Sequence, residues 1–132
     1  MNLKFAIVCD NAFTDPEGRL NIIQVFDTIF APNFPAIHPR LSIVTSYSLD
    51  KGDNKTEEYK QLLKIVNTKT GKEMFKLERA IKPNAGRDSY VQYIANIVGV
   101  TFPNEGRYEV LTQLNEKDFG TVASISVNKE SN

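Results

Sequence analysis

Near the end of the chain, residues 107–114 have the two-residue period of a β-strand. In an extended backbone successive side chains point to opposite faces, so the even-numbered side chains share one face: Tyr108, Val110, Thr112 and Leu114. The corner Pro103-Asn104-Glu105-Gly106 comes just before, and its glycine suits a turn that needs a positive φ. The segment therefore predicts a strand that buries one face and is entered through a tight turn.

The tyrosine that begins this strand predicts how the turn is held. A Tyr in this position can bury its ring in the core while its hydroxyl bonds back to the turn, as in the tyrosine corner of β-sandwiches. We therefore expect Tyr108 to be buried and its hydroxyl to bond to the 103–106 corner.

Alternating or wholly apolar runs recur along the chain, separated by Gly, Pro, Asn and Asp. They predict strands at 3–9, 20–30, 40–49, 57–66, 75–81, 90–101, 107–114 and 119–127. Residues 20–30 and 90–101 are apolar on both faces, which favours central positions, or for 20–30 a bulge that swaps faces. Residues 55–64 also carry charges at helical spacing, so a helix stays open there as an alternative.

About eight short strands without a clear helix predict an all-β protein: a single domain over residues 1–132, folded as an antiparallel two-sheet β-sandwich of Ig-like or Greek-key type. If the strands run up and down, the loops alternate between the two ends. One end then gathers polar, Asp-rich loops at 10–18, 49–56, 82–89 and 115–118. The other end gathers loops at 31–39, 67–72 and 101–106.

The segment 31–39 contains three prolines, which remove amide donors and bias the preceding residues to extended backbone. We expect a stiff, apolar loop rather than a regular element. A stiff apolar loop loses little entropy on binding, which suits recognition of another protein. Alternatively, Phe34, Ile37 and Phe102 fold inward and plug the end of the sandwich. As a binding surface the loop would offer Phe34, Ile37 and His38, with Arg40 as a rim charge.

The charge balance bears on the class of partner. The chain has 16 basic and 16 acidic residues, whereas nucleic acid or an anionic membrane favours a surplus of Lys and Arg. We therefore expect neither as a partner. The one cysteine, Cys9, cannot form an intramolecular disulfide, and no apolar run is long enough for a signal peptide or a spanning helix. We expect a cytoplasmic protein.

Cys9 and the lone His38 are the residues from which a thiol nucleophile and its base could be built. However, Cys9 is in the buried phase of its strand and His38 lies in a loop at the opposite end, which favours a core cysteine. One His and one Cys cannot complete a zinc site. The sequence thus predicts no catalytic residue, no metal and no cofactor.

The Asp-rich loop end leaves one other interpretation open, a site for calcium or another small ligand. Calcium needs roughly six to eight convergent oxygens. The aspartates of these loops are separated along the chain and mixed with Lys and Arg, so solvated turns are the simpler interpretation.

Several motifs occur in a fixed order: Phe5-Ala6-Ile7-Val8-Cys9-Asp10, Val25-Phe26-Asp27, Phe34-Pro35-Ala36-Ile37-His38-Pro39, and Phe102-Pro103 followed by Gly106 and Tyr108. The set resembles a bacterial family known only as a domain of unknown function. The resemblance implies a small cytoplasmic β-domain and carries no activity with it. The chain departs from the family pattern at Gln24, where the pattern has a glycine that permits a tight backbone approach.

Together these features predict a non-enzymatic protein-interaction module. Its partner would be an unknown protein or a second copy of the chain, bound through the 31–39 loop or through an exposed strand edge. The alternative function is the binding of calcium or a small ligand at the polar end.

Overall fold

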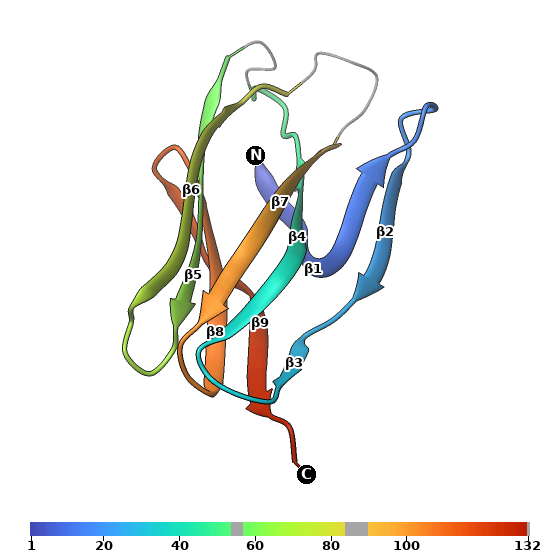
Figure 1. The fold of residues 1–132 in the computed structure, drawn as a ribbon. Coiled ribbons are helices and arrows are strands. Elements are labelled where there is room, and N and C mark those ends of the chain that lie inside the picture. The colour runs from blue at the N-terminus through green and yellow to red at the C-terminus, as the bar shows by residue number, and fades with distance from the viewer. Residues whose placement is uncertain (54–56, 84–89, 132) are drawn as a thin grey trace.

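The computed structural model describes residues 1–53, 57–83 and 90–131 (Figure 1). These residues form β1 (Asn2–Thr14), β2 (Leu20–Val25), β3 (Thr28–Ala31), β4 (Ala36–Ser48), β5 (Tyr59–Asn67), β6 (Glu73–Ile81), β7 (Tyr90–Phe102), β8 (Gly106–Leu114) and β9 (Lys117–Lys129). Within these ranges no helix has the length and apolar character that crossing a membrane requires.

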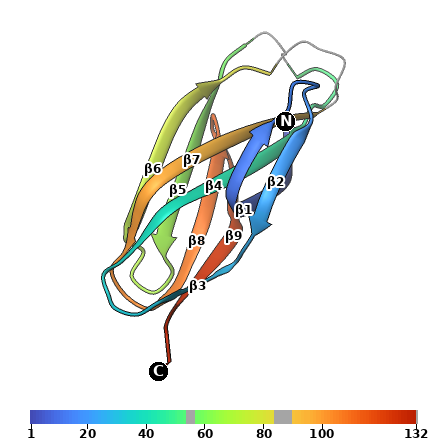
Figure 2. The same cartoon turned by 45° about the vertical axis from the view of Figure 1, so that its right-hand side comes forward.

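The strands form two sheets packed face to face (Figure 2). The first sheet has the order β2-β1-β4-β7 and the second the order β3-β9-β8-β5-β6. Neighbouring strands are antiparallel except β3 and β9, which are parallel. The two-sheet β-sandwich predicted from the sequence is confirmed.

The main core lies between the sheets and consists of side chains at every second position. The buried side chains of β8 are Tyr108, Val110, Thr112 and Leu114, none more than 3% exposed. Tyr108 and Val110 belong to the main core, and Leu114 to a second cluster. The fully buried Leu41 and Ile43 of β4 and Leu63 and Ile65 of β5 also belong to the main core. The two-residue period predicted for 107–114 is therefore confirmed.

The turn before β8 is held as the sequence predicts. The hydroxyl of Tyr108 donates a hydrogen bond of 2.7 Å to the carbonyl oxygen of Asn104, and its ring packs edge-on against Phe102 with a centroid distance of 4.9 Å. Gly106 has a φ of +145°, a backbone conformation that favours glycine.

Strand β1 is longer than predicted and turns back near its middle (Figure 1). Its residues 2–9 pair with β4 and its residues 9–14 pair with β2. The second half of β1 and β2 form a hairpin, whose side chains Ala12, Leu20 and Ile22 pack with Val44 on the outer face of the first sheet. As a result β4 is buried on both faces from Leu41 to Tyr47.

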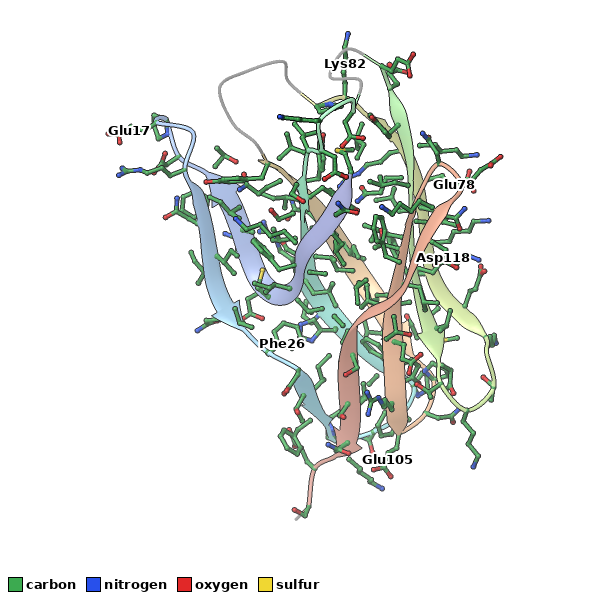
Figure 3. The ribbon with its side chains drawn as sticks, turned by 180° about the vertical axis from the view of Figure 1, so that it is seen from behind. Glu17, Phe26, Glu78, Lys82, Glu105 and Asp118 are labelled. Atoms are coloured by element: carbon green, nitrogen blue, oxygen red, sulfur yellow. The ribbon has the colours of Figure 1, made fainter. Side chains whose placement is uncertain are left out.

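The apolar segment 20–30, predicted as one central strand or as a strand with a bulge that swaps faces, forms two strands at sheet edges. The chain passes from the first sheet to the second at Phe26 (Figure 3). The amide of Phe26 donates to the carbonyl of Val8 at 3.1 Å, and the next carbonyl, of Asp27, accepts from Ser126 of β9 at 2.7 Å. Odd- and even-numbered positions of residues 20–30 are both apolar because β2 and the segment from Phe26 onward pack into different clusters.

Strand β7 also lies at an edge, so the central position predicted for 90–101 is wrong. Its two apolar faces have separate reasons. Ala95 and Ile97 face the main core, whereas Ile94 packs with the cluster beneath the β1–β2 hairpin. Because the β1–β2 hairpin packs on Ile94, the edge strand β7 is apolar on both faces, as a central strand would be.

Residues 36–39, expected to be loop, belong to β4 and pair with β7. The ladder joins His38 to Val100 and Arg40 to Val98, so Pro39 lies opposite Gly99, whose φ is +70°. A proline is tolerated within a sheet where the pairing is irregular, because no ladder amide is needed there.

The helical alternative for 55–64 is wrong for the part that the structure describes, since β5 begins at Tyr59. The expected alternation of the loops is visible in Figure 1, where the β3–β4, β5–β6 and β7–β8 connections lie at the end nearer the C-terminus. In the polar loops, residues 54–56 and 84–89 lie outside the described residues.

Candidate interaction groove

The passage of the chain from β2 to β3 leaves two adjacent hollows on the surface. The first, of about 430 Å³, extends from Ile29 to Pro39. The second, of about 540 Å³, extends from Asp10 and Gln24 to His38. Both are lined by Ile29, Phe30 and His38, so we call the two hollows together the β3 groove.

Large apolar side chains stand exposed along the β3 groove. Val25 is 64% exposed, Phe30 63% and Ile37 68%. Single exposed apolar residues are ordinary on a soluble protein, but several around one concave surface are typical of an interaction site.

The floor of the groove is fixed by packing against the core. The ring of His38 lies against that of Phe26 with a centroid distance of 5.4 Å, and Phe26 and Ile29 pack against the main core. The polar groups of the lining include the imidazole of His38 and the side chain of Asp10. A preformed apolar hollow with a few polar groups is the usual character of a binding site.

Of the four predicted contact residues, the structure brings two into the groove. Ile37 and His38 line it. Phe34 packs against the main core and borders a different hollow. Arg40 is exposed beyond the groove lining, and its Nη2 donates to the side-chain oxygen of Asn11 at 2.9 Å, which ties β4 to β1.

The two interpretations of the 31–39 segment each hold for part of it. Phe102 is fully buried and Phe34 partly buried against the core, as expected of a plug. Ile37 points outward, because successive side chains of β4 point to opposite faces and its neighbour Ala36 is buried.

The sequence did not single out Val25 and Phe30. Both lie in the apolar segment 20–30, which predicts burial, and their exposure follows from the division of that segment between two sheet edges. Asp27 is the one charged residue between Leu20 and Phe30, and it marks the passage between the sheets.

The thiol of Cys9 is not placed to act as a nucleophile. The residue is fully buried, and its Sγ donates to the carbonyl oxygens of Asn11 at 3.4 Å and Ser42 at 3.7 Å. Burial raises the pKa of the Cys9 thiol, as does the charge of Asp10, while the hydrogen bond with Asn11 lowers it; the net direction is upward. A buried neutral thiol is a poor nucleophile.

Two aspartates of the polar end, Asp53 and Asp15, are engaged by other groups of the chain. Asp53 forms an ion pair of 2.9 Å with the N-terminal ammonium and accepts from the amide of Asp50. Burial raises the pKa of Asp53, but these hydrogen bonds outweigh it and the pKa lies below its usual value. Asp15 accepts from the amides of Glu17 and Arg19. Across residues 1–53, 57–83 and 90–131, no three His, Cys, Asp or Glu side chains are grouped to hold a metal ion.

The comparisons with known proteins give a family and no activity. A family model described as "Family of unknown function (DUF6941)" matches residues 4–127. No curated protein matches the chain.

Proposed function

The chain belongs to this family of unknown function, and from its structure we propose that it is a non-enzymatic protein-interaction module. Its β3 groove binds an extended apolar segment of a partner protein. The observation that carries the proposal is the exposure of two large apolar side chains beside preformed hollows: Phe30 is 63% exposed and Ile37 is 68% exposed. Phe30 lines both hollows.

The backbone of β3 supports an extended occupant. β3 is the outer strand of its sheet. The carbonyl of Asp27 accepts from Ser126 of β9, and that of Ala31 accepts from Glu130, the residue after β9. Because successive peptide groups of a strand point to opposite sides, the backbone groups of Thr28 and Phe30 face the free edge. An added strand could bond there and place alternate side chains in the hollows.

The absence of an enzymatic role is part of the proposal. The buried Cys9 thiol is beyond the reach of a substrate, and the His38 ring packs on Phe26. We also propose a cytoplasmic location, for which the single, reduced cysteine is the support.

Selection of peptides from a random library displayed on phage tests the proposal. Wild-type protein should select apolar, extended peptides, and the double substitution Phe30→Ser and Ile37→Ser should weaken their binding roughly tenfold or more, because central apolar contacts each contribute more than about 1 kcal/mol. Phe34 is left unchanged, since it packs on the core.

The matched control is Val98→Ser on β7, which removes another exposed apolar side chain, 81% exposed, outside the groove lining. Both variants should unfold at the wild-type temperature. Unaltered peptide binding by a folded double variant, or equal loss in the Val98→Ser control, would rule out the groove.

A further inference from the structure

We propose that β2 is a self-association strand, which pairs antiparallel with β2 of a second copy of the chain. This surface differs from the free edge of β3, and its proposal does not depend on the peptide-binding role of the groove. Gln24 and Val25 at the end of β2 line the groove, whereas residues 20–23 contribute to the features described above only through the packing of their inner face.

The two sheets have four outer strands, β2 and β7 in the first and β3 and β6 in the second. Exposed strand edges attract other strands unless charge, proline or bulges protect them. β6 carries four charged residues. β3 is followed by Pro32, and its edge is the one that the peptide in the groove would occupy. β7 is capped at Ile94, whose carbonyl accepts from Arg79 at 3.0 Å, and is irregular at Gly99.

β2 has neither the charge nor the proline of these edges. Its sequence, Leu-Asn-Ile-Ile-Gln-Val, contains neither a charged residue nor a proline. The left-handed backbone of Gln24, with a φ of +55°, marks where the strand begins to leave the sheet. The segment available for pairing is therefore 20–23.

The hydrogen bonds of the hairpin show which backbone groups point outward. The amide of Asp15 donates to the carbonyl of Arg19 at 2.9 Å, and the register continues through Phe13–Asn21 to Asn11–Ile23. Hydrogen-bonded pairs alternate along an antiparallel ladder, so Leu20 and Ile22 direct their amides and carbonyls to the free edge.

Two large apolar side chains stand exposed on the outer face of the hairpin beside this edge. Phe13 and Ile23 are each 43% exposed. Their register places both on one face, opposite to the face of Ala12 and Ile22 that packs on the first sheet. We call Phe13 and Ile23 the hairpin stripe.

A second copy is the occupant that matches both features. An uncharged edge beside an apolar stripe fits a strand with the same properties, and the chain itself supplies one. Its formal net charge is zero, so two copies do not repel each other through net charge. A two-fold pairing centred on Asn21 lets Leu20 and Ile22 of each copy exchange hydrogen bonds. It places Ile23 of each copy opposite Arg19 of the other and keeps the two stripes on one face of the joined sheet.

Sedimentation velocity over a range of protein concentrations tests the pairing. The wild-type chain should pass from one to two chain masses as its concentration rises. Ile23→Lys places a charge in the stripe and should hold the protein at one chain mass, with an unchanged circular-dichroism spectrum. Val98→Lys, the matched change on β7, should still dimerise.

A disulfide tests the register. Asn21→Cys should form an interchain disulfide under mild oxidation, because a pair of this kind brings Cα atoms to about 4.5 Å. Lys76→Cys on β6 should not, and the buried Cys9 should take no part.

Three results would overturn the pairing. The first is a wild-type chain that keeps one chain mass up to millimolar concentration, and the second is a dimer that Ile23→Lys leaves intact. The third is cross-linking through Lys76→Cys in preference to Asn21→Cys. A dimer that survives Phe30→Ser and Ile37→Ser while peptide binding is lost would separate this surface from the groove.

Discussion

The guanidinium of Arg79 on β6 donates a hydrogen bond of 3.0 Å from Nη1 to the carbonyl oxygen of Ile94 on β7. Its Nε donates to the side-chain oxygen of Gln61 at 2.8 Å, and the amide of Gln61 in turn donates to the hydroxyls of Tyr47 and Thr45. The outer strands of the two sheets are thus joined through a buried polar network. Burial lowers the pKa of Arg79, and nearby Tyr47 and Tyr93 oppose that change.

Arg79→Lys should destabilise the protein although it keeps the charge. An ammonium cannot reproduce the fork that bonds Gln61 and Ile94 together, and a buried acceptor without its donor costs about 1–3 kcal/mol. Urea unfolding measures this loss. Lys76→Arg on the exposed face of the same strand should change the free energy of unfolding by less than about 0.5 kcal/mol. Equal stability of Arg79→Lys and wild type would contradict a structural role for the fork.

Tyr108→Phe should lower the free energy of unfolding by about 1 kcal/mol, because it removes the bond from the buried hydroxyl to the carbonyl of Asn104. Tyr90→Phe, at a residue that is 41% exposed, is the control and should have little effect. Thermal or urea unfolding of both variants decides the matter. An equal response would mean that the corner does not depend on this hydroxyl.

Gln24→Gly should stabilise the protein. The exposed Gln24 has a φ of +55°, a left-handed conformation that costs a side-chain-bearing residue about 1 kcal/mol or more and glycine very little. We expect a gain of about 0.5–1 kcal/mol after the greater flexibility of glycine in the unfolded chain is counted. Gln24→Ala keeps the unfavourable conformation and should give no gain; a similar gain from alanine would remove this explanation.

The Cys9 thiol should resist modification in the folded protein and react fully in urea. Its folded pKa lies above the ordinary value of 9.0, so the unfolded chain ionises first as the pH rises. The contribution of the neutral, buried thiol to the free energy of unfolding is fully present below the unfolded pKa and is lost as the pH rises through the folded pKa. Relative to Cys9→Ala, the wild type should therefore lose stability above about pH 9. A thiol that reacts rapidly in native protein would contradict the buried placement.

Much of the fold follows from local pattern in the sequence. The alternation in 107–114 and the Tyr108 corner are local properties, and both are confirmed. The edge positions of β2, β3 and β7 could not be predicted, because apolar residues on both faces have two causes: neighbours on either side within a sheet, or a third element packed over one face. Val44 and Ile94 show the second cause, since both are covered by a hairpin from the distant N-terminal segment.

The groove was predictable only in part. The prolines indicate a stiff apolar segment, which singles out Ile37 and His38. Whether a particular aromatic ring faces solvent depends on tertiary packing, so the sequence left both roles of Phe34 open and did not predict that Phe30 is exposed. Asp27, within an apolar segment, is the local signal that could have located the passage between sheets.

Photo-crosslinking from the groove tests the central claim most directly. A photoreactive phenylalanine analogue at position 30 or 37, introduced in cells that make the protein, should join the chain to an apolar segment of one other protein, identified by mass spectrometry. The analogue at position 98, which is outside the groove lining and more open to solvent than either, should give no such product. Crosslinks that are absent from positions 30 and 37, or that are the same at all three positions, would contradict a binding role for the β3 groove.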